Sequence, residues 1–310
     1  MTPSVAIAII TLDRHAQLAK TLDHLRGVDL SSVSEVLIVD QTESLFEIES
    51  WSRDFPVPLR LVNQKRKGLS SARNEALRRT DGDIILFIDD DVIPDRELVN
   101  EHLRTYVNYT TAIGVAGREI VPPGRRSRFR SWTRRAVITA LLPYFRTSRY
   151  YRRFLNERGY PVAIVTRTGL FLCDFTQHYP CRVITVRGCN MSFRREALLS
   201  IGGFDDAFAG PRRDESDVSL SLLAAMPNGE LRFNPLAKLT HLMIPTGGCR
   251  SDPNREWYVK LLQSELRFAR KHLTHTGYVI CSIRLAVIHV MALIRYPSLF
   301  KVLLRSGSSR

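Results

Sequence analysis

Short apolar runs alternate with amphipathic stretches along the first 90 residues of the chain. The runs are rich in Val, Ile and Leu, as the buried strands of a parallel sheet are; they are Val5–Ile10, Glu35–Asp40, Leu59–Asn63 and Asp83–Asp89. Between the first two runs, Leu18, Leu22 and Leu25 recur at i, i+4 and i+7, which indicates a helix with one apolar face. A second helical pattern ends near Arg79, before the fourth run. This β-α-β alternation predicts a doubly wound α/β domain.

The pattern is less regular after residue 90. It predicts these elements in order: a helix Asp95–Val107, a strand Ala112–Val121, a strand Val183–Val186, a loop Gly188–Asn190, a helix Arg195–Ile201, a helix opening at Asp214, and strands Glu230–Asn234 and Ala237–His241. From about Asp252 onward the pattern is helical. We therefore divide the chain into a domain 1–250, with a basic insert at about 118–160, and a C-terminal helical extension 251–310 that is a candidate for membrane association.

Acidic residues stand where three of the predicted strands end. Asp13 follows the first strand, Asp40 ends the second and Asp89–Asp91 end the fourth. In open α/β sheets, ligands bind outside the carboxyl ends of the strands. Because side chains alternate along a strand, Asp89 and Asp91 are expected to converge while the residue between them points elsewhere. Two close carboxylates suit Mg²⁺ or Mn²⁺ bridging to a diphosphate, and the alternative is an acidic loop that caps the next helix.

Several short motifs occur in a fixed order between about residues 5 and 245. In the first half they are Ile9–Arg14 (IITLDR), Leu37–Gln41 (LIVDQ), Gly68–Asn74 (GLSSARN) and Phe87–Asp91 (FIDDD). In the second half they are Gly188–Glu196 (GCNMSFRRE), Gly202–Asp205 (GGFD), Arg213–Val218 (RDESDV) and His241. With these motifs, in this order and at this spacing, the chain resembles the family 2 glycosyltransferases.

The resemblance implies a fold, a reaction and a set of site residues. The fold would be α/β of the GT-A type, a doubly wound mixed sheet flanked by helices, with the basic insert and the C-terminal helices added. The reaction would move a sugar, with inversion, from a nucleotide diphosphate sugar to a hydroxyl acceptor. The residues that would bind the donor are Thr11, Asp13, Arg14, Asp40, Arg73 and Asp90, with Asp40 at the base or ribose and Arg73 at the diphosphate. The residues that would hold Mg²⁺ or Mn²⁺ are Asp89, Asp91 and His241.

Inverting transfer needs a base that takes the proton of the attacking hydroxyl. In the family this is a carboxylate of an acidic pair at the start of a helix, most often Glu followed by Asp, whereas this chain has Asp214 followed by Glu215. We expect Glu215 to be the base because it takes the second position, with Asp214 as the alternative. Asp217 matches a further acid of the family, or is a first-turn charge stabilised by the helix dipole.

The net charge of +14 is concentrated in one part of the chain. Of the 45 basic residues 38 are Arg, and between Arg118 and Arg158 there are 12 Arg against two acids. Three interpretations stay open for this insert: a membrane-surface element, a nucleic-acid contact through phosphates, or a solvated loop over the active site. Arg beside the apolar stretch Ala136–Phe145 and beside Trp132 favours an anionic membrane surface over nucleic acid. Tyr278–Ile294 is either a second membrane contact or a helix packed on the domain.

The five cysteines form no C-x-x-C pair and indicate a reduced, cytoplasmic setting in which they are small buried hydrophobes. Val5–Ile10 lacks the basic flank of a signal peptide. The leading hypothesis is a transferase peripheral to the cytoplasmic membrane face that extends a glycan or lipid-linked acceptor for a surface polysaccharide or glycolipid. A nucleotidyltransferase is disfavoured because Thr11–Arg14 contains no glycine. The alternative to an enzyme is a basic protein that binds a membrane or nucleic acid and carries a vestigial transferase site.

Overall fold

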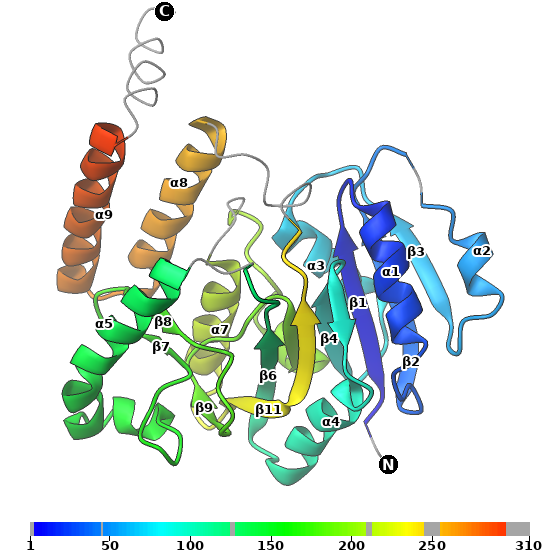
Figure 1. The fold of residues 1–310 in the computed structure, drawn as a ribbon, viewed down its shortest axis with the longest axis horizontal. Helices are drawn as coiled ribbons and strands as arrows, with labels where there is room; N and C mark the ends of the chain where they lie inside the picture. Colours follow the sequence, from blue (N-terminus) through cyan, green and yellow to red (C-terminus); the bar gives the residue numbers. More distant parts are fainter. Residues whose placement is uncertain (1–2, 45, 125–127, 209–212, 245–254, 296–310) are drawn as a thin grey trace, which may run out of the picture.

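A mixed β-sheet runs through the centre of the protein, and helices lie against both of its faces (Figure 1). The structure, a computed structural model, describes residues 3–44, 46–124, 128–208, 213–244 and 255–295. The strands of this sheet are β1 (Val5–Thr11), β2 (Val33–Asp40), β3 (Leu59–Asn63), β4 (Ile84–Asp89), β5 (Val92–Pro94), β6 (Ala112–Ile120), β9 (Cys181–Val183), β10 (Asn190–Arg194) and β11 (Glu230–His241). A separate two-stranded sheet consists of β7 (Ala163–Val165) and β8 (Phe171–Cys173).

The helices follow the strands in an alternating order over the first half of the chain. They are α1 (His15–Leu25), α2 (Glu49–Ser52), α3 (Leu69–Arg79), α4 (Leu98–Asn108), α5 (Arg128–Thr147), the 3₁₀ helix η1 (Tyr151–Phe154), α6 (Arg195–Ser200), α7 (Asp214–Ala225), α8 (Arg255–His272) and α9 (His275–Arg295). The strand order in the large sheet is β3-β2-β1-β4-β10-β6-β11-β5, with β9 paired to β11. The first four strands are parallel, and β10 lies antiparallel between β4 and β6. The predicted α/β class, a doubly wound mixed sheet flanked by helices, is confirmed.

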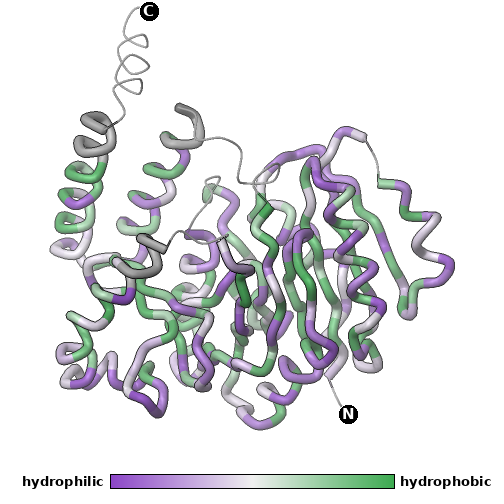
Figure 2. The backbone as a smooth tube through the Cα atoms, in the orientation of Figure 1, coloured by the Kyte–Doolittle hydropathy of each residue, from purple (hydrophilic) through white to green (hydrophobic). Residues whose placement is uncertain are grey.

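Each face of the sheet has its own hydrophobic core. On one face, Leu18 and Leu22 of α1 pack with Ile7 and Ile9 of β1 and with apolar residues of α4. On the other face, α3 and α7 pack against alternate residues of the same strands, such as Phe87 of β4. Figure 2 shows that hydrophobic segments follow the central strands. A strand buried on both faces reads as a continuous apolar run, which is why these strands stand out in the sequence.

The predicted elements of the second half need three corrections. Strand β10 begins at Asn190, so the last residue of the predicted loop Gly188–Asn190 belongs to a strand. This five-residue strand was not among the predicted elements. The two predicted strands at 230–241 are one strand, β11, whose register with β6 shifts between Asn234 and Lys238. The strand predicted at Val183–Val186 is β9, which ends at Val183.

The basic insert carries a third hydrophobic core. Ile138 and Phe145 of α5 are buried there with Tyr151 of η1 and Phe268 of α8. These two α5 residues therefore do not face a membrane, and this part of the membrane interpretation is corrected. Val137 and Tyr144 of the same helix are exposed. The side chain of Trp132, like Cys249, lies outside the described residues.

The two C-terminal helices lie beside α5 at the end of the molecule remote from β3 (Figure 1). α8 contacts α7 and α9, and its Phe268 is fully buried. Within the described part of the chain, no helix combines the length and the apolar character that crossing a bilayer requires.

Candidate active site

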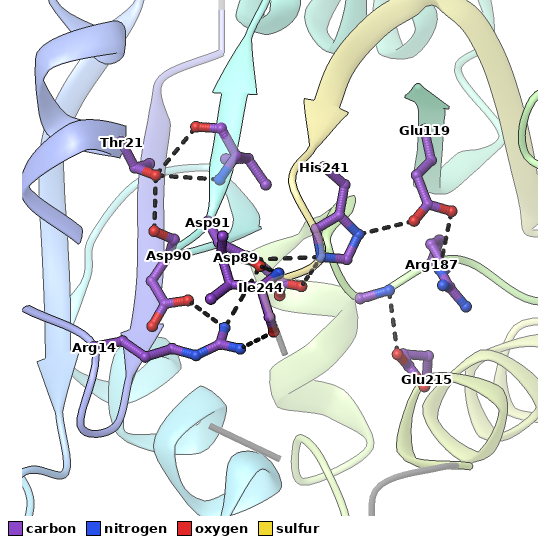
Figure 3. Close-up of polar contacts among 12 residues, drawn as sticks. Arg14, Thr21, Asp89, Asp90, Asp91, Glu119, Arg187, Glu215, His241 and Ile244 are labelled. Carbon is purple, nitrogen blue, oxygen red and sulfur yellow. Dashed lines mark hydrogen bonds and ion pairs between the residues drawn. The ribbon is translucent and has the colours of Figure 1, made fainter. Parts of the chain in front are cut away.

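Asp89 and Asp91 lie at the carboxyl end of β4, where β11 brings His241 against them (Figure 3). The short strand β5 pairs antiparallel with β11 so that His241 stands opposite Val92, the residue after Asp91. The His241 Nε2 atom is 3.5 Å from Asp89 Oδ2 and 3.3 Å from Asp91 Oδ1. Asp89 and Asp91 thus both approach the same ring nitrogen of His241.

Asp90 points the other way, toward the end of β1. Its carboxylate accepts hydrogen bonds from Thr11 Oγ1 at 2.8 Å and from Arg14 Nη1 at 2.9 Å. Burial raises the pKa of Asp90 to about 6 although Arg14 opposes the shift. Arg14 also lies 3.7 Å from Asp91 Oδ2 and donates to the carbonyl oxygen of Ile244. Arg14 thus links Asp90 of the predicted donor site to Asp91 of the predicted metal site.

Glu119, at the end of β6, holds the other side of the His241 ring. His241 Nδ1 is 2.8 Å from Glu119 Oε1, and both side chains are buried. Burial alone would lower the pKa of His241, but the neighbouring Cys189, Asp91 and Glu119 raise it to about 12. The cluster therefore carries surplus negative charge. Glu119 was not among the predicted site residues; it stands next to Arg118 near the end of β6, within the stretch assigned to the basic insert.

The residues of this cluster fit a divalent cation. Asp91 Oδ1 is buried and accepts no well-formed hydrogen bond from the described residues, although His241 Nε2 is near it. Ligand atoms of Asp89, Cys189 and His241 all lie within 4.8 Å of one another. The carboxylate on the far side of the imidazole fixes the ring so that Nε2 faces the acids, as the outer partners of metal-binding histidines do. The Asp89 side chain is 36% exposed, which leaves the cluster open to a ligand.

A second acidic group, Asp214 and Glu215, begins helix α7. Asp214 is buried and directly contacts Arg73, whereas Glu215 is half-buried and accepts a hydrogen bond from the Gly188 N–H at 3.2 Å. Burial and the charge of Glu215 raise the pKa of Asp214 well above its ordinary value. Burial acts the same way on Glu215, but Arg73 and a hydrogen bond from Asp214 lower its pKa overall. The pKa of Asp214 is thus raised and that of Glu215 lowered, so a proton taken up by the pair is favoured on Asp214.

Asp217, the third predicted acid of α7, is not part of this pair. Its carboxylate is 2.8 Å from Lys271 Nζ and 2.6 Å from His272 Nε2, both on α8. Arg213, the residue directly before α7, is also held by α8, since its guanidinium donates two hydrogen bonds to Glu265. The structure thus assigns Asp217 to the contact between α7 and α8 and does not bring it to the other two acids.

Four consecutive residues connect the two acidic groups. Arg187 Nε is 3.4 Å from Glu119, and Gly188 donates to Glu215. Cys189 lies beside Asp89 and His241. Asn190 is held by the buried His102, whose Nε2 is 2.8 Å from the Asn190 Oδ1 atom. A Cβ atom at position 188 would lie 2.5 Å from Glu215 Oε1 and 2.6 Å from Arg73 Nη2, so a larger residue there would displace these two side chains.

The remaining predicted donor residues lie at the ends of β1 and β2 and on α3. The buried Asp40 carboxylate is 2.7 Å from His15 Nε2 and accepts from the Thr42 N–H. Asp13 is exposed and has a left-handed backbone, with φ of 56°. Arg73 is only 2% exposed and contacts Asp214, so it adjoins the acidic pair, and its expected role at the diphosphate stays a prediction.

Comparisons with known proteins agree with this architecture. The family model described as glycosyl transferase family 2 matches residues 6–175. The chain is 23% identical over 206 residues to a glucosyl-dolichyl phosphate glucuronosyltransferase of Haloferax volcanii, which covers 66% of this chain and 56% of that protein. It is 28% identical over 106 residues to the uncharacterized glycosyltransferase YfnE of Bacillus subtilis, which covers 33% of this chain and 27% of that protein. The alignments thus span between about a quarter and just over half of these relatives.

Two solved structures show the same fold. GalNAc-T7, crystallised with UDP, GalNAc and Mn²⁺, has a TM-score of 0.61 at 13% identity and covers 87% of this chain and 50% of its own. The mannosyltransferase PcManGT of Pyrobaculum calidifontis, in complex with GDP-Man and Mn²⁺, has a TM-score of 0.54 at 18% identity and covers 100% and 76%. At these identities the likeness shows the fold, and the predicted GT-A type is confirmed.

Proposed function

The chain belongs to glycosyl transferase family 2, and from this premise we propose that it is an inverting, metal-dependent glycosyltransferase. It moves a sugar from a nucleotide diphosphate sugar to a hydroxyl group of a glycan or a lipid-linked acceptor. One observation carries the proposal: the cluster of Asp89, Cys189 and His241 and the carboxylate of Glu215 are joined through the short loop that carries Gly188.

The donor diphosphate belongs at the cluster that Asp89, Asp91 and His241 form. These residues would hold Mg²⁺ or Mn²⁺, which when bound supplies Lewis acidity to the diphosphate as it departs. The half-exposed Asp89 carboxylate faces the side from which a ligand can approach. Arg14 keeps Asp90 and Asp91 in fixed positions, and Glu119 keeps His241 oriented. The chain's own residues therefore prepare the donor site before a ligand arrives.

The acceptor hydroxyl belongs at Glu215. An inverting displacement forms the new bond on the face of the sugar opposite to the leaving diphosphate, so a base is needed on that face. Glu215 is half-buried and its pKa is lowered, whereas the pKa of Asp214 is raised and its side chain is buried against Arg73. Glu215 therefore takes the hydroxyl proton, and Asp214 with Arg73 positions it. The Gly188 N–H fixes one Glu215 oxygen.

We also propose that the protein works at an anionic membrane surface on the cytoplasmic side. Five apolar residues of α9 are between 40% and 59% exposed, and they are Val279, Ile280, Ile283, Val287 and Ile288. α9 contains no acidic residue. The exposed Arg135, Arg146 and Arg149 lie on or beside α5, at the same end of the molecule (Figure 1). Each basic residue near such a surface contributes about 1 kcal/mol of attraction to anionic lipid.

A reciprocal experiment tests the two parts of this function. Asp91→Asn is expected to reduce Mn²⁺-dependent hydrolysis of UDP- and GDP-sugars by more than about 100-fold, since even outer partners of metal ligands are worth about 10- to 100-fold. Its binding to phosphatidylglycerol vesicles is expected to persist. Ile283→Asp is expected to lose vesicle binding and keep the hydrolysis.

Asp95→Asn is the matched control, because Asp95 pairs with Lys238 on the surface, away from the cluster. It is expected to keep both properties. If the wild-type protein binds no nucleotide sugar with either cation, or if Asp91→Asn keeps full hydrolysis, the proposed transferase is wrong. The basic binding protein with a vestigial site is then the better account.

A further inference from the structure

Cys189 stands among the residues that fit a cation. Its Sγ atom, a carboxylate oxygen of Asp89 and a ring nitrogen of His241 all lie within 4.8 Å of one another. Over the described ranges, this is the one set of three His, Cys, Asp or Glu side chains gathered so closely. We propose that Cys189 is a ligand of the divalent cation and that its sulfur makes the site prefer thiophilic cations to Mg²⁺. The inference rests on the proposed use of a cation by this protein.

The pairing of two strands places Cys189 beside Asp89. β10 runs antiparallel to β4, and Asn190 is the register partner of Ile88. The residue before Asn190 therefore lies next to the residue after Ile88, and these two are Cys189 and Asp89. The position follows from backbone pairing, so it does not depend on a chance side-chain rotamer.

Both neighbours of Cys189 are held in place. The Asn190 amide donates to the Ala237 carbonyl oxygen at 2.9 Å and its Oδ1 contacts the buried His102. On the other side, the Gly188 N–H is bonded to Glu215. Cys189 itself is only 3% exposed. A thiol fixed in this way is pre-organised for a cation between it and His241, because little ordering remains to be done on binding.

The chemistry of sulfur gives the expected selectivity. On binding, the S–H bond breaks, the sulfur electron pair forms the bond to the cation and the proton leaves to solvent. Thiolate is a soft ligand that suits Zn²⁺ and similar ions, whereas Mg²⁺ prefers oxygen ligands in octahedral geometry. A site with two carboxylates, an imidazole and a thiolate is therefore expected to bind Co²⁺, Zn²⁺ and Mn²⁺ more tightly than Mg²⁺.

Cobalt titration of the full chain tests the ligand directly, without any turnover. Co²⁺ is added to the reduced protein alone and then with uridine diphosphate, while near-ultraviolet absorption is followed for the sulfur-to-cobalt charge-transfer band. The wild-type protein is expected to show the band. Cys189→Ser is expected to bind Co²⁺ by calorimetry and lack the band. The matched control is Cys281→Ser, because Cys281 is also buried but lies on α9, and it is expected to keep the band.

Selectivity provides the second readout. The ratio of Mn²⁺ to Mg²⁺ affinity, measured by calorimetry, is expected to fall by at least about tenfold in Cys189→Ser, because a hard hydroxyl replaces a soft thiolate. The proposal is overturned if wild-type protein binds Co²⁺ without the band, or if Cys189→Ser keeps the band or the wild-type ratio. These results leave the transferase proposal standing. Failure of every variant to bind any divalent cation contradicts the proposed metal dependence as well.

Discussion

The two acidic groups of the site differ in how their negative charge is balanced. At the end of β4, Asp89, Asp91 and Glu119 surround one imidazole, and the surplus of negative charge raises the pKa of His241 to about 12. At the start of α7, Asp214 and Glu215 lie beside Arg73, and the pKa of Asp214 is raised while that of Glu215 is lowered. The first group is suited to a cation and the second to receiving a proton.

This difference shows that the same residue type acquires opposite chemistry from its surroundings. Carboxylates that face each other with too few positive partners attract a metal ion. A buried pair with an adjacent guanidinium instead separates into a protonated acid and an ionised base. Asp217, two residues beyond Glu215, has a third role because it points at α8.

The largest expected effect on turnover comes from replacing each of the two paired acids, Glu215 and Asp214, by its amide. Glu215→Gln removes the base and is expected to lower turnover by about 10²- to 10⁴-fold at saturating metal and donor. Asp214→Asn mimics the protonated carboxyl and is expected to keep most of the turnover. Steady-state kinetics with the preferred donor, together with donor binding by calorimetry, distinguishes these results. If Asp214→Asn is the inactive variant and Glu215→Gln the active one, the assignment of the proton is reversed.

An intermediate effect is expected from Arg73→Gln. Arg73 lowers the pKa of Glu215, so its removal raises that pKa. Because the base works only when ionised, the acid limb of the pH profile of kcat/KM is expected to move to higher pH. The loss at neutral pH is expected to be smaller than that of Glu215→Gln, because the base itself is retained.

Arg78→Gln is the matched control for this change. Arg78 is on the same helix but exposed, and it pairs with Glu75 on the surface. Its pH profile is expected to coincide with that of the wild-type protein. An unchanged acid limb in Arg73→Gln would mean that Arg73 does not tune the base.

The smallest effect on turnover is expected from Asp217→Asn. The change weakens the contacts with Lys271 and His272, so the free energy of unfolding is expected to fall by about 1–3 kcal/mol. Turnover is expected to change only a few-fold, because this side chain faces α8. Urea denaturation and kinetics on the same preparation measure both quantities. A loss of turnover as large as that of Glu215→Gln would return Asp217 to the catalytic group.

Much of the first half of the protein was predictable from the sequence. The strands β1 to β4 are buried on both faces, so each is a continuous apolar run with a clear end. The convergence of Asp89 with Asp91 follows from alternation along a strand, which is a local property. His241 was found only because the order of motifs resembled a family.

The contacts between distant segments were not predictable in the same way. Glu119 and Cys189 reach the site through the pairing of β6, β10 and β11, and His102 reaches it from helix α4; these segments are far apart along the chain. The cysteines looked alike in the sequence, and only the register of β10 against β4 distinguishes Cys189. The contact of Arg73 on helix α3 with Asp214 likewise joins segments that are distant along the chain.

The sequence by itself determined the α/β class, the family and the edge of the sheet at which the acids gather, because apolar periodicity and short motifs are properties of neighbouring residues. Only the folded protein shows which positive side chains neighbour each acid, which acid of the Asp214–Glu215 pair has the raised pKa, and which cysteine adjoins the proposed cation ligands. Those properties depend on burial and on distances of a few ångströms between segments. They exist only once the strands have paired and α7 has packed against α8.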